Sequence, residues 1–286
     1  MSRIPARLKL GEEGTLTAEL LPRAGMGVGA VRFANRLVSW QRSAYSTASS
    51  SHADPWLNAF SGGLITTCGL RNVGAPSEGH GLHGRFALTP TETARVDRPA
   101  SDVWSVSAEL NDDMLHCSRT VVVDCARGFV EILDAVRNDG VLPEPAPLLY
   151  HVNFGGDLLG ISTCVRLQSR GYEARDTASN LECGHWSAPS SVGASHEVVL
   201  EHQSVDGEEG VTVMNYEAGI RAHVQWTGLH RLHQWIDFQP GWGVMAIEPA
   251  NCSLLGRRVD RESGRLPTLA PREVRWTSVR VTMEVI

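Results

Sequence analysis

Hydrophobic and polar residues alternate with a period of two along much of this chain. The pattern is plainest in Val103–Ala108, Leu115–Asp124 and Gly128–Val136, which are separated by short clusters of turn-forming residues. Runs of this length and period, bounded by turns, are typical of antiparallel β-strands. We therefore expect this part of the chain to form an antiparallel sheet.

Strand-like runs of the same kind recur on both sides of this region. They cover residues 15–20, 25–29, 31–33, 37–41, 148–154, 163–168, 196–202, 210–215, 218–226, 232–237, 243–248 and 273–285. We find no convincing stripe of twelve or more residues with the 3.6-residue period of an amphipathic helix. Residues 45–53, YSTASSSHA, are small and polar and predict a loop. The pattern predicts an all-β fold: one domain over residues 1–286 that forms a large antiparallel β-sandwich.

Composition and charge narrow the classes of partner. Hydrophobic residues make up 42% of the 286 residues, charged residues make up 20%, and the net charge is −6. This balance, with no Lys/Arg-rich run, argues against electrostatic binding to nucleic acid or to an anionic membrane. No apolar stretch approaches the roughly 18 to 20 residues that span a bilayer. The oligomeric state is left open, and a homodimer is one arrangement that the sequence allows.

The cysteines and the first residues favour a cytoplasmic protein. Six cysteines are scattered through apolar runs without C-x-x-C spacing, which argues for reduced, mostly buried thiols rather than a zinc module. The first fourteen residues contain no apolar signal-peptide region.

Candidate chemistry begins in residues 62–90, a segment rich in glycine. This segment contains His83-Gly84-Arg85, in which a titratable imidazole and a permanent cation flank a residue without a side chain. His83 can exchange a proton near neutral pH, and Arg85 offers a planar set of donors to sugar hydroxyls or a carboxylate. We expect Gly84 to let a ligand approach the backbone closely. Arg71 adds a second guanidinium to the same segment.

Two later strands carry further polar side chains. His151 and Asn153 are two residues apart, so their side chains leave the same face of a strand. Glu248 comes at the end of an apolar strand, directly before Pro249; it is either a functional rim residue or an edge charge that discourages aggregation.

Two imidazoles and a carboxylate on separate strands are suited to general acid–base chemistry on a small polar substrate. The same residue types also bind zinc, and His80, His83, His151 and Glu248 form an alternative ligand set. However, His80-x-x-His83 in a glycine-rich loop is weak ligand spacing, and we predict no metal.

Taken in order along the chain, five segments resemble the aldose 1-epimerase (galactose mutarotase) superfamily, and in particular a branch known as aldose-1-epimerase-like. These segments are GGLITTCGLRNVG (62–74), LHGR (82–85), YHVNFG (150–155), the pair Arg175-Asp176, and IEPANC (247–252). The resemblance covers roughly residue 25 to the C-terminus. It implies a large β-sandwich with a carbohydrate site in the concave face of one sheet.

The resemblance also implies roles for individual residues. Glu248 would be the general base that takes the proton from the anomeric hydroxyl, and His151 would be the general acid that protonates the ring oxygen. His83 would hold the ring oxygen and a neighbouring hydroxyl. The resemblance implies a small-molecule sugar substrate and no metal or organic cofactor. The candidates for contacts with further hydroxyls are Arg71, Arg85, Asn153, Asn251, Asp176 and Asp237, and the choice between the two aspartates stays open.

Three departures from the superfamily pattern qualify this interpretation. Arg85 stands where classical mutarotases have glycine, which hints at an acidic or phosphorylated sugar or at another substrate pose. The segment after His151 lacks the longer aromatic motif of the classical enzymes, and Pro249 replaces their usual threonine. The leading hypothesis is a sugar mutarotase or related isomerase. The alternatives are a non-catalytic sugar-binding protein and a carbohydrate lyase or hydrolase, because a fold does not fix a function.

Overall fold

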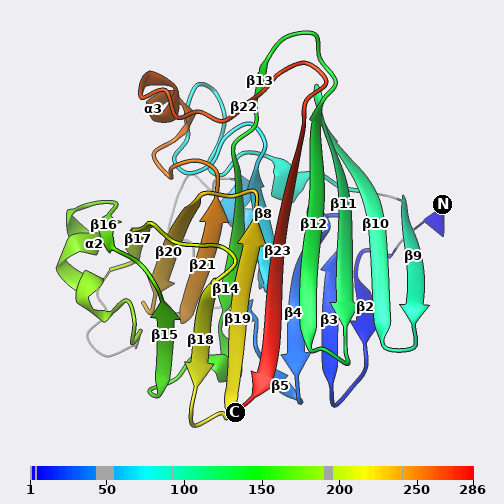
Figure 1. Ribbon diagram of the computed structural model, residues 1–286, viewed down its shortest axis with the longest axis vertical. Coiled ribbons are helices and arrows are strands. Elements are labelled where there is room, and N and C mark those ends of the chain that lie inside the picture. Colours follow the sequence, from blue (N-terminus) through cyan, green and yellow to red (C-terminus); the bar gives the residue numbers. More distant parts are fainter. Residues whose placement is uncertain (1, 4, 43–54, 92, 190–195, 240) are drawn as a thin grey trace.

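The computed structural model describes residues 2–3, 5–42, 55–91, 93–189, 196–239 and 241–286. In this part of the chain, two large sheets built from antiparallel strand pairs lie one behind the other (Figure 1). The predicted all-β antiparallel sandwich is confirmed. The loop predicted at residues 45–53 lies outside the described residues, and the single domain over residues 1–286 stays a prediction.

The first sheet has nine strands within the described residues. Their spatial order is β1 (Ser2–Arg3), β9 (Thr93–Ala100), β10 (Val103–Asp112), β11 (Leu115–Asp124), β12 (Phe129–Asn138), β23 (Val274–Val285), β19 (Ile220–Thr227), β18 (Val211–Asn215) and β15 (Thr163–Leu167).

The second sheet has ten strands within the described residues, and it carries the candidate site. Its order is β16 (Gly171–Ala174), β17 (Val198–Gln203), β20 (Arg231–Asp237), β21 (Val244–Ala250), β14 (Leu148–Phe154), β8 (Ile65–Gly69), β4 (Gly27–Phe33), β3 (Leu16–Leu21) and β2 (Leu8–Gly11), with β5 (Arg36–Leu37) paired to β4.

Short elements connect the strands. Two small ladders pair β13 (Glu144–Pro145) with β22 (Thr268–Leu269), and β6 (Trp40–Gln41) with β7 (Gly62–Gly63). The α-helices in the described residues are α1 (Pro55–Ala59), α2 (Thr177–Glu182) and α3 (Arg257–Glu262), and short 3₁₀ turns cover Phe86–Leu88, Gly156–Leu158 and Cys183–His185. None of these helices is long and apolar enough to cross a membrane.

The two-residue period of β14 explains how one strand serves two environments. Tyr150, Val152 and Phe154 belong to the main hydrophobic core, which collects side chains from both sheets. Leu149 belongs to a smaller apolar cluster, whose members on β20 and β21 alternate in the same way with main-core residues. Because successive side chains of a strand point to opposite faces, this second cluster lies on the outer face of the ten-stranded sheet. His151 has the same parity as Leu149 and shares that face.

A buried charged network joins the two sheets through the main core. Arg119 of β11 donates two hydrogen bonds to Asp134 of β12 and a third to Thr67 Oγ1 of β8, at 3.0 Å. Tyr150 of β14 donates from its hydroxyl to Asp134. Both side chains of the Arg119–Asp134 ion pair are fully buried. A buried ion pair is tolerated when its remaining donors and acceptors are satisfied, as they are here.

Candidate active site

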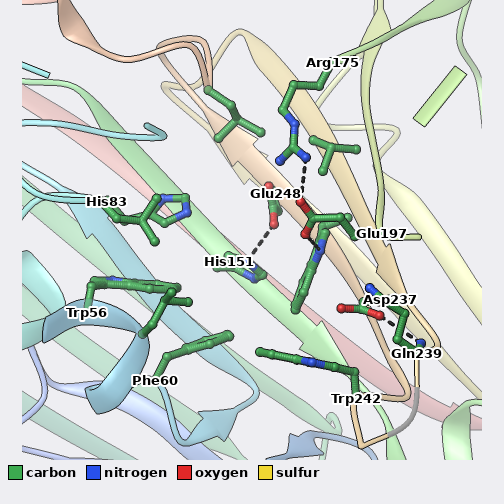
Figure 2. A pocket seen from close by; sticks show the side chains of 15 residues that line it. Trp56, Phe60, His83, His151, Arg175, Glu197, Asp237, Gln239, Trp242 and Glu248 are labelled. Carbon is green, nitrogen blue, oxygen red and sulfur yellow. Dashed lines mark hydrogen bonds and ion pairs between the residues drawn. The ribbon is translucent and has the colours of Figure 1, made fainter. Parts of the chain in front are cut away.

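A cavity of about 390 Å³ opens on the outer face of the ten-stranded sheet. Strands β14, β20 and β21 provide its floor, and α1 and the loop residues around positions 82–83, 239, 242 and 254 provide its walls (Figure 2). The lining residues are Trp56, Leu57, Phe60, Leu82, His83, His151, Arg175, Glu197, Val199, Trp235, Asp237, Gln239, Trp242, Glu248 and Leu254.

An acid–base pair lies on the cavity floor. The pairing of Leu149 with Ala250, and of Val152 with Ile247, makes His151 of β14 the cross-strand neighbour of Glu248 of β21. Their side chains meet with His151 Nε2 2.8 Å from Glu248 Oε1, and these side chains are 6% and 2% exposed. Buried groups so close exchange protons readily, and both also line the cavity, so a bound ligand can reach them.

The protonation of Glu248 is controlled by two opposing effects. Burial raises the pKa of its carboxyl group. The charge of His151 and its hydrogen bond to Glu248 lower this pKa, and the charges of His233 and His83 add to that effect, so that the lowering exceeds the rise from burial. The net pKa lies below the ordinary value, because opposite charge and hydrogen bonding favour the carboxylate. Glu248 is therefore ionised at neutral pH and available as a base.

His83 reaches the cavity from a tightly folded loop. Its backbone φ is +53°, and the ring stacks at a tilt on Trp56 with 4.5 Å between centroids. The ring lies 6.3 Å from that of His151. The Gly74 N–H donates to His83 Nδ1 at 3.4 Å, which places the proton of a neutral ring on Nε2. In this tautomer His83 can donate a hydrogen bond to a ligand in the cavity.

Gly84 has a different role from the one expected. A Cβ at this position would lie 2.5 Å from the carbonyl oxygens of both Asn72 and Gly69, and the φ of Gly84 is +70°. Its missing side chain therefore admits the chain's own backbone, not a ligand. This close contact fixes the loop that carries His83.

Aromatic rings form one wall of the cavity. Figure 2 shows Trp56, Phe60 and Trp242 along the side opposite Arg175 and Glu197. Trp56 and Phe60 stack with 4.5 Å between centroids, and Trp235 meets the ring of His151 edge-on at 5.2 Å. Such rings present flat apolar surfaces suited to the C–H faces of a sugar.

Arg175, Glu197 and Trp235 form a linked polar rim on the opposite side. Glu197 accepts from Arg175 Nη2 at 2.5 Å and from Trp235 Nε1 at 3.0 Å (Figure 2). Arg175 also donates from Nε to Asp176 at 2.8 Å. These bonds hold the guanidinium beside the cavity and fix the plane of the indole.

Asp237 is a second carboxylate of the cavity lining. It is 4% exposed, and its Oδ1 accepts from the Gln239 N–H at 2.9 Å. Burial raises the pKa of Asp237 by more than the Gln239 hydrogen bonds lower it. A buried carboxylate with acceptor capacity to spare can bind substrate hydroxyls.

Both arginines of residues 62–90, Arg71 and Arg85, lie outside the cavity. Arg71 forms an ion pair with Glu144 at 2.8 Å and another with Asp113 at 3.1 Å. Arg85 is exposed and does not line the cavity. Neither arginine enters the site that we propose below.

Three further candidates are also held elsewhere. The Asn153 amide donates to the carbonyl oxygens of Gly63 and His151. Asn251 accepts from the Leu148 N–H at 2.7 Å and so ties β21 to β14. Asp176 accepts from the Ser179 N–H and caps α2. Of the two aspartates left open, Asp237 is the one that lines the cavity.

The zinc alternative gains no support from the geometry. Among the described residues, no group of three or more His, Cys, Asp and Glu side chains is arranged to hold a metal ion. His80 Nε2 accepts a hydrogen bond from Arg257 Nη1 at 2.9 Å, within an ion network on α3.

Several lining residues were not among the sequence candidates. The spacing of Trp56 and Phe60, four residues apart just before residue 62, is the signal that could have indicated an aromatic helix face at the site. Trp235 has the same strand parity as Asp237. Arg175 belongs to the Arg175-Asp176 pair of the resemblance, but its place at the cavity depends on the pairing of β16 with β17, which the sequence does not reveal.

Comparison with known proteins agrees with this architecture. Residues 6–285 match the model of a family described as Domain of unknown function (DUF4432). No curated protein matches the chain in sequence. Among solved structures, the chain is similar to a candidate aldose 1-epimerase from Klebsiella pneumoniae, with 18% identity, a TM-score of 0.85, and coverage of 97% of this chain and 79% of that one.

Two further solved structures show the same fold. A galactose mutarotase-like protein from Clostridium acetobutylicum has 13% identity and a TM-score of 0.61, covering 96% of this chain and 94% of that one. An aldose epimerase homologue from C. elegans has 14% identity and a TM-score of 0.64, covering 98% and 99%. The galactose mutarotase-like fold that the sequence motifs indicated is confirmed.

Proposed function

We propose that this chain, which belongs to the DUF4432 family, is a carbohydrate mutarotase that interconverts the anomers of an aldose. The observation that carries the proposal is the buried contact of 2.8 Å between His151 Nε2 and Glu248 Oε1 on the cavity floor. Mutarotation needs a base and an acid at two oxygens bonded to the same carbon atom, the anomeric hydroxyl and the ring oxygen. His151 and Glu248, whose reactive atoms lie 2.8 Å apart, meet that need as acid and base.

Ring opening follows from these two groups. Glu248 takes the proton of the anomeric hydroxyl, and the electrons of that O–H bond form the carbonyl at C1. The bond between C1 and the ring oxygen breaks, and the ring oxygen receives a proton from His151. Rotation about C1–C2 and the reverse transfers then close the ring on the other face. General acid–base catalysis of this kind contributes about 10²- to 10⁴-fold.

The remaining lining residues bind and orient the sugar. His83 donates from Nε2 toward the ring oxygen or a neighbouring hydroxyl. Asp237 accepts from hydroxyls on the far edge of the ring. The aromatic wall of Trp56, Phe60 and Trp242 packs against the C–H face.

The charges of the site favour an uncharged sugar over an acidic or phosphorylated one. Arg85, the residue that suggested an anionic substrate, lies outside the cavity. Arg175 lines the cavity but is paired with Asp176 and Glu197. An anionic substrate would therefore meet Glu197, Asp237 and Glu248 without a free guanidinium to offset them.

Anomer exchange of aldoses, followed by NMR saturation transfer or polarimetry, tests the proposal. The protein should accelerate exchange of at least one aldose above its spontaneous rate. An unchanged rate over a panel of aldoses and uronic acids would contradict it. Thermal stabilisation by a sugar without turnover would favour a sugar-binding protein, and a mass change of an oligosaccharide or uronate would favour a hydrolase or lyase.

A further inference from the structure

A second, smaller hollow adjoins the candidate active site on the same face of the sheet. Its volume is about 110 Å³. It shares Arg175, Val199 and Leu254 with the main cavity, so the two spaces are neighbours. Its other lining residues are Glu173, Ala174, Leu200, Glu201, His233, Ser253 and Leu255. We call this space the side compartment.

A row of polar residues crosses the sheet and connects the two spaces. His151 and Glu248 are cross-strand neighbours, Glu248 pairs with His233, His233 pairs with Glu201, and Glu201 pairs with Glu173. Residues opposite each other in adjacent strands share one face of the sheet and lie about 5 Å apart. The side compartment therefore begins one strand beyond Glu248, on the side away from His151.

This order along the row matches the order of atoms in an aldose ring. In the proposed reaction, His151 protonates the ring oxygen and Glu248 takes the proton from the hydroxyl on C1. The ring oxygen and C2 are the two ring neighbours of C1. If the ring oxygen lies over His151, C2 lies on the other side of Glu248 and its substituent points toward His233 and the side compartment.

The size and lining of the side compartment fit more than a hydroxyl group. A volume of about 110 Å³ holds several water molecules, each of which needs roughly 10–15 Å³. Val199 and Leu254 offer apolar contacts for a methyl group. Arg175 donates to Asp176 from Nε and to Glu197 from Nη2, which leaves Nη1 for a carbonyl oxygen. Glu201 and Glu173 each use Oε1 to accept from a neighbouring side chain, which leaves Oε2 for an N–H group. An acetamido group has all three features.

We propose, on the basis of the mutarotase function above, that the side compartment binds the C2 substituent of the sugar and that the preferred substrates are 2-acetamido-2-deoxy aldoses. Main-cavity contacts are common to all aldoses. The side compartment adds selectivity, because only a 2-acetamido sugar fills it.

A substrate series tests this proposal directly. Anomer exchange is measured for N-acetylglucosamine, glucose and 2-deoxyglucose, and for the matching galactose derivatives. One or two added hydrogen bonds predict a kcat/KM about tenfold higher for the acetamido sugar than for its 2-hydroxy parent. Exchange of the 2-hydroxy sugars with equal or slower exchange of the acetamido sugars would overturn the side-compartment proposal and leave the mutarotase function standing. Acceleration of no sugar in the series would overturn the side-compartment proposal, and an unchanged rate over the wider panel of aldoses and uronic acids would overturn the mutarotase function as well.

Variants on the side compartment sharpen the test. Glu201→Gln and Glu173→Gln should each lower the ratio of the two kcat/KM values toward one, whereas Glu131→Gln on the other sheet should leave the ratio unchanged. Because the ratio is measured on one preparation, partial loss of folded protein does not affect it. An unchanged ratio in both side-compartment variants would overturn the assignment of these carboxylates to the C2 substituent.

Discussion

Tyr150 and His151 are consecutive residues of β14 whose side chains serve opposite faces of the ten-stranded sheet. The Tyr150 hydroxyl donates to Asp134 in the core between the sheets, and His151 contacts Glu248 on the cavity floor. The strand that carries the proposed acid is thus fixed from behind by a buried charged network. Stability and site geometry are coupled through this strand.

Arg119→Met should destabilise the protein strongly. The change leaves Asp134 buried without its cation, and removing one partner of a buried pair costs about 3–5 kcal/mol. Urea unfolding followed by circular dichroism measures this. Arg280→Met is the control, because Arg280 pairs with Glu131 at a partly exposed site and its loss should cost no more than about 1 kcal/mol. Equal losses in both variants would contradict a special role for the core network.

Glu248→Gln should abolish most of the proposed activity while the fold is retained. The amide keeps the shape of the side chain but cannot take a proton, so kcat/KM should fall about 10²- to 10⁴-fold. Glu131→Gln, which changes a carboxylate on the other sheet, should leave kcat/KM near the wild-type value. Retention of full activity in Glu248→Gln would rule out this residue as the base.

The pH dependence should reflect the lowered pKa of Glu248. Because the folded-state pKa lies below the ordinary value of 4.5, the carboxylate persists as the pH falls past 4.5. The stability it contributes is present above the unfolded-state pKa and is lost as the pH falls through the folded-state pKa. The acid limb of kcat/KM should therefore lie below pH 4.5.

His151→Gln supplies the control for that prediction. It removes the largest opposing influence on Glu248 and leaves burial, which raises the pKa of the carboxyl group. Any residual activity should then show its acid limb at higher pH than in the wild type. A limb that stays in place would mean that another group controls it.

Asp237→Asn should stabilise the protein at neutral pH and weaken sugar binding. Burial raises the pKa of Asp237, so the folded state binds this proton more tightly than the unfolded state does. The ionised side chain therefore costs stability above its folded-state pKa, and the cost disappears as the pH falls. Thermal unfolding should give a higher Tm for the variant at pH 7 than for the wild type and a smaller difference near pH 3. A lower Tm at pH 7 would contradict this account.

Gly84→Ala should perturb His83 in a way that Gly79→Ala does not. Both glycines have positive φ, but a Cβ at Gly84 meets two carbonyl oxygens at 2.5 Å, whereas a Cβ at Gly79 has no atom within 4 Å. Gly79→Ala should cost about 1–2 kcal/mol from the backbone conformation alone. Gly84→Ala should cost more and also lower kcat/KM. Similar effects of the two changes on kcat/KM would contradict a positioning role for Gly84.

The sequence predicted strands better than it predicted contacts between loops. The prediction for residues 148–154 coincides with β14, because its apolar run is bounded by proline and glycine. The separate runs predicted at residues 25–29 and 31–33 form one strand, β4 (Gly27–Phe33). Local pattern locates a strand, but it does not show where the strand ends when glycines interrupt the pattern.

The same limit applies to the candidate site. His83, His151 and Glu248 line one cavity, and the apolar runs placed the last two on strands. The prediction that Glu248 ends its strand was wrong, because β21 continues through Pro249 to Ala250 and lies inside the sheet, between β20 and β14. Arg71 could not be assigned from sequence, because its partner Glu144 is 73 residues away. The catalytic roles of the three cavity residues rest on the proposal above.

The cross-strand contact between His151 and Glu248 ties the proposed catalysis to strand alignment. A slip of β21 by a single residue against β14 would turn the carboxylate toward the core and bring a hydrophobic side chain to the cavity floor. A sheet in which β21 is misaligned against β14 therefore lacks the contact between His151 and Glu248. Any chain that has misassembled during folding is therefore expected to be inactive, so specific activity would report directly on the fraction of correctly aligned molecules.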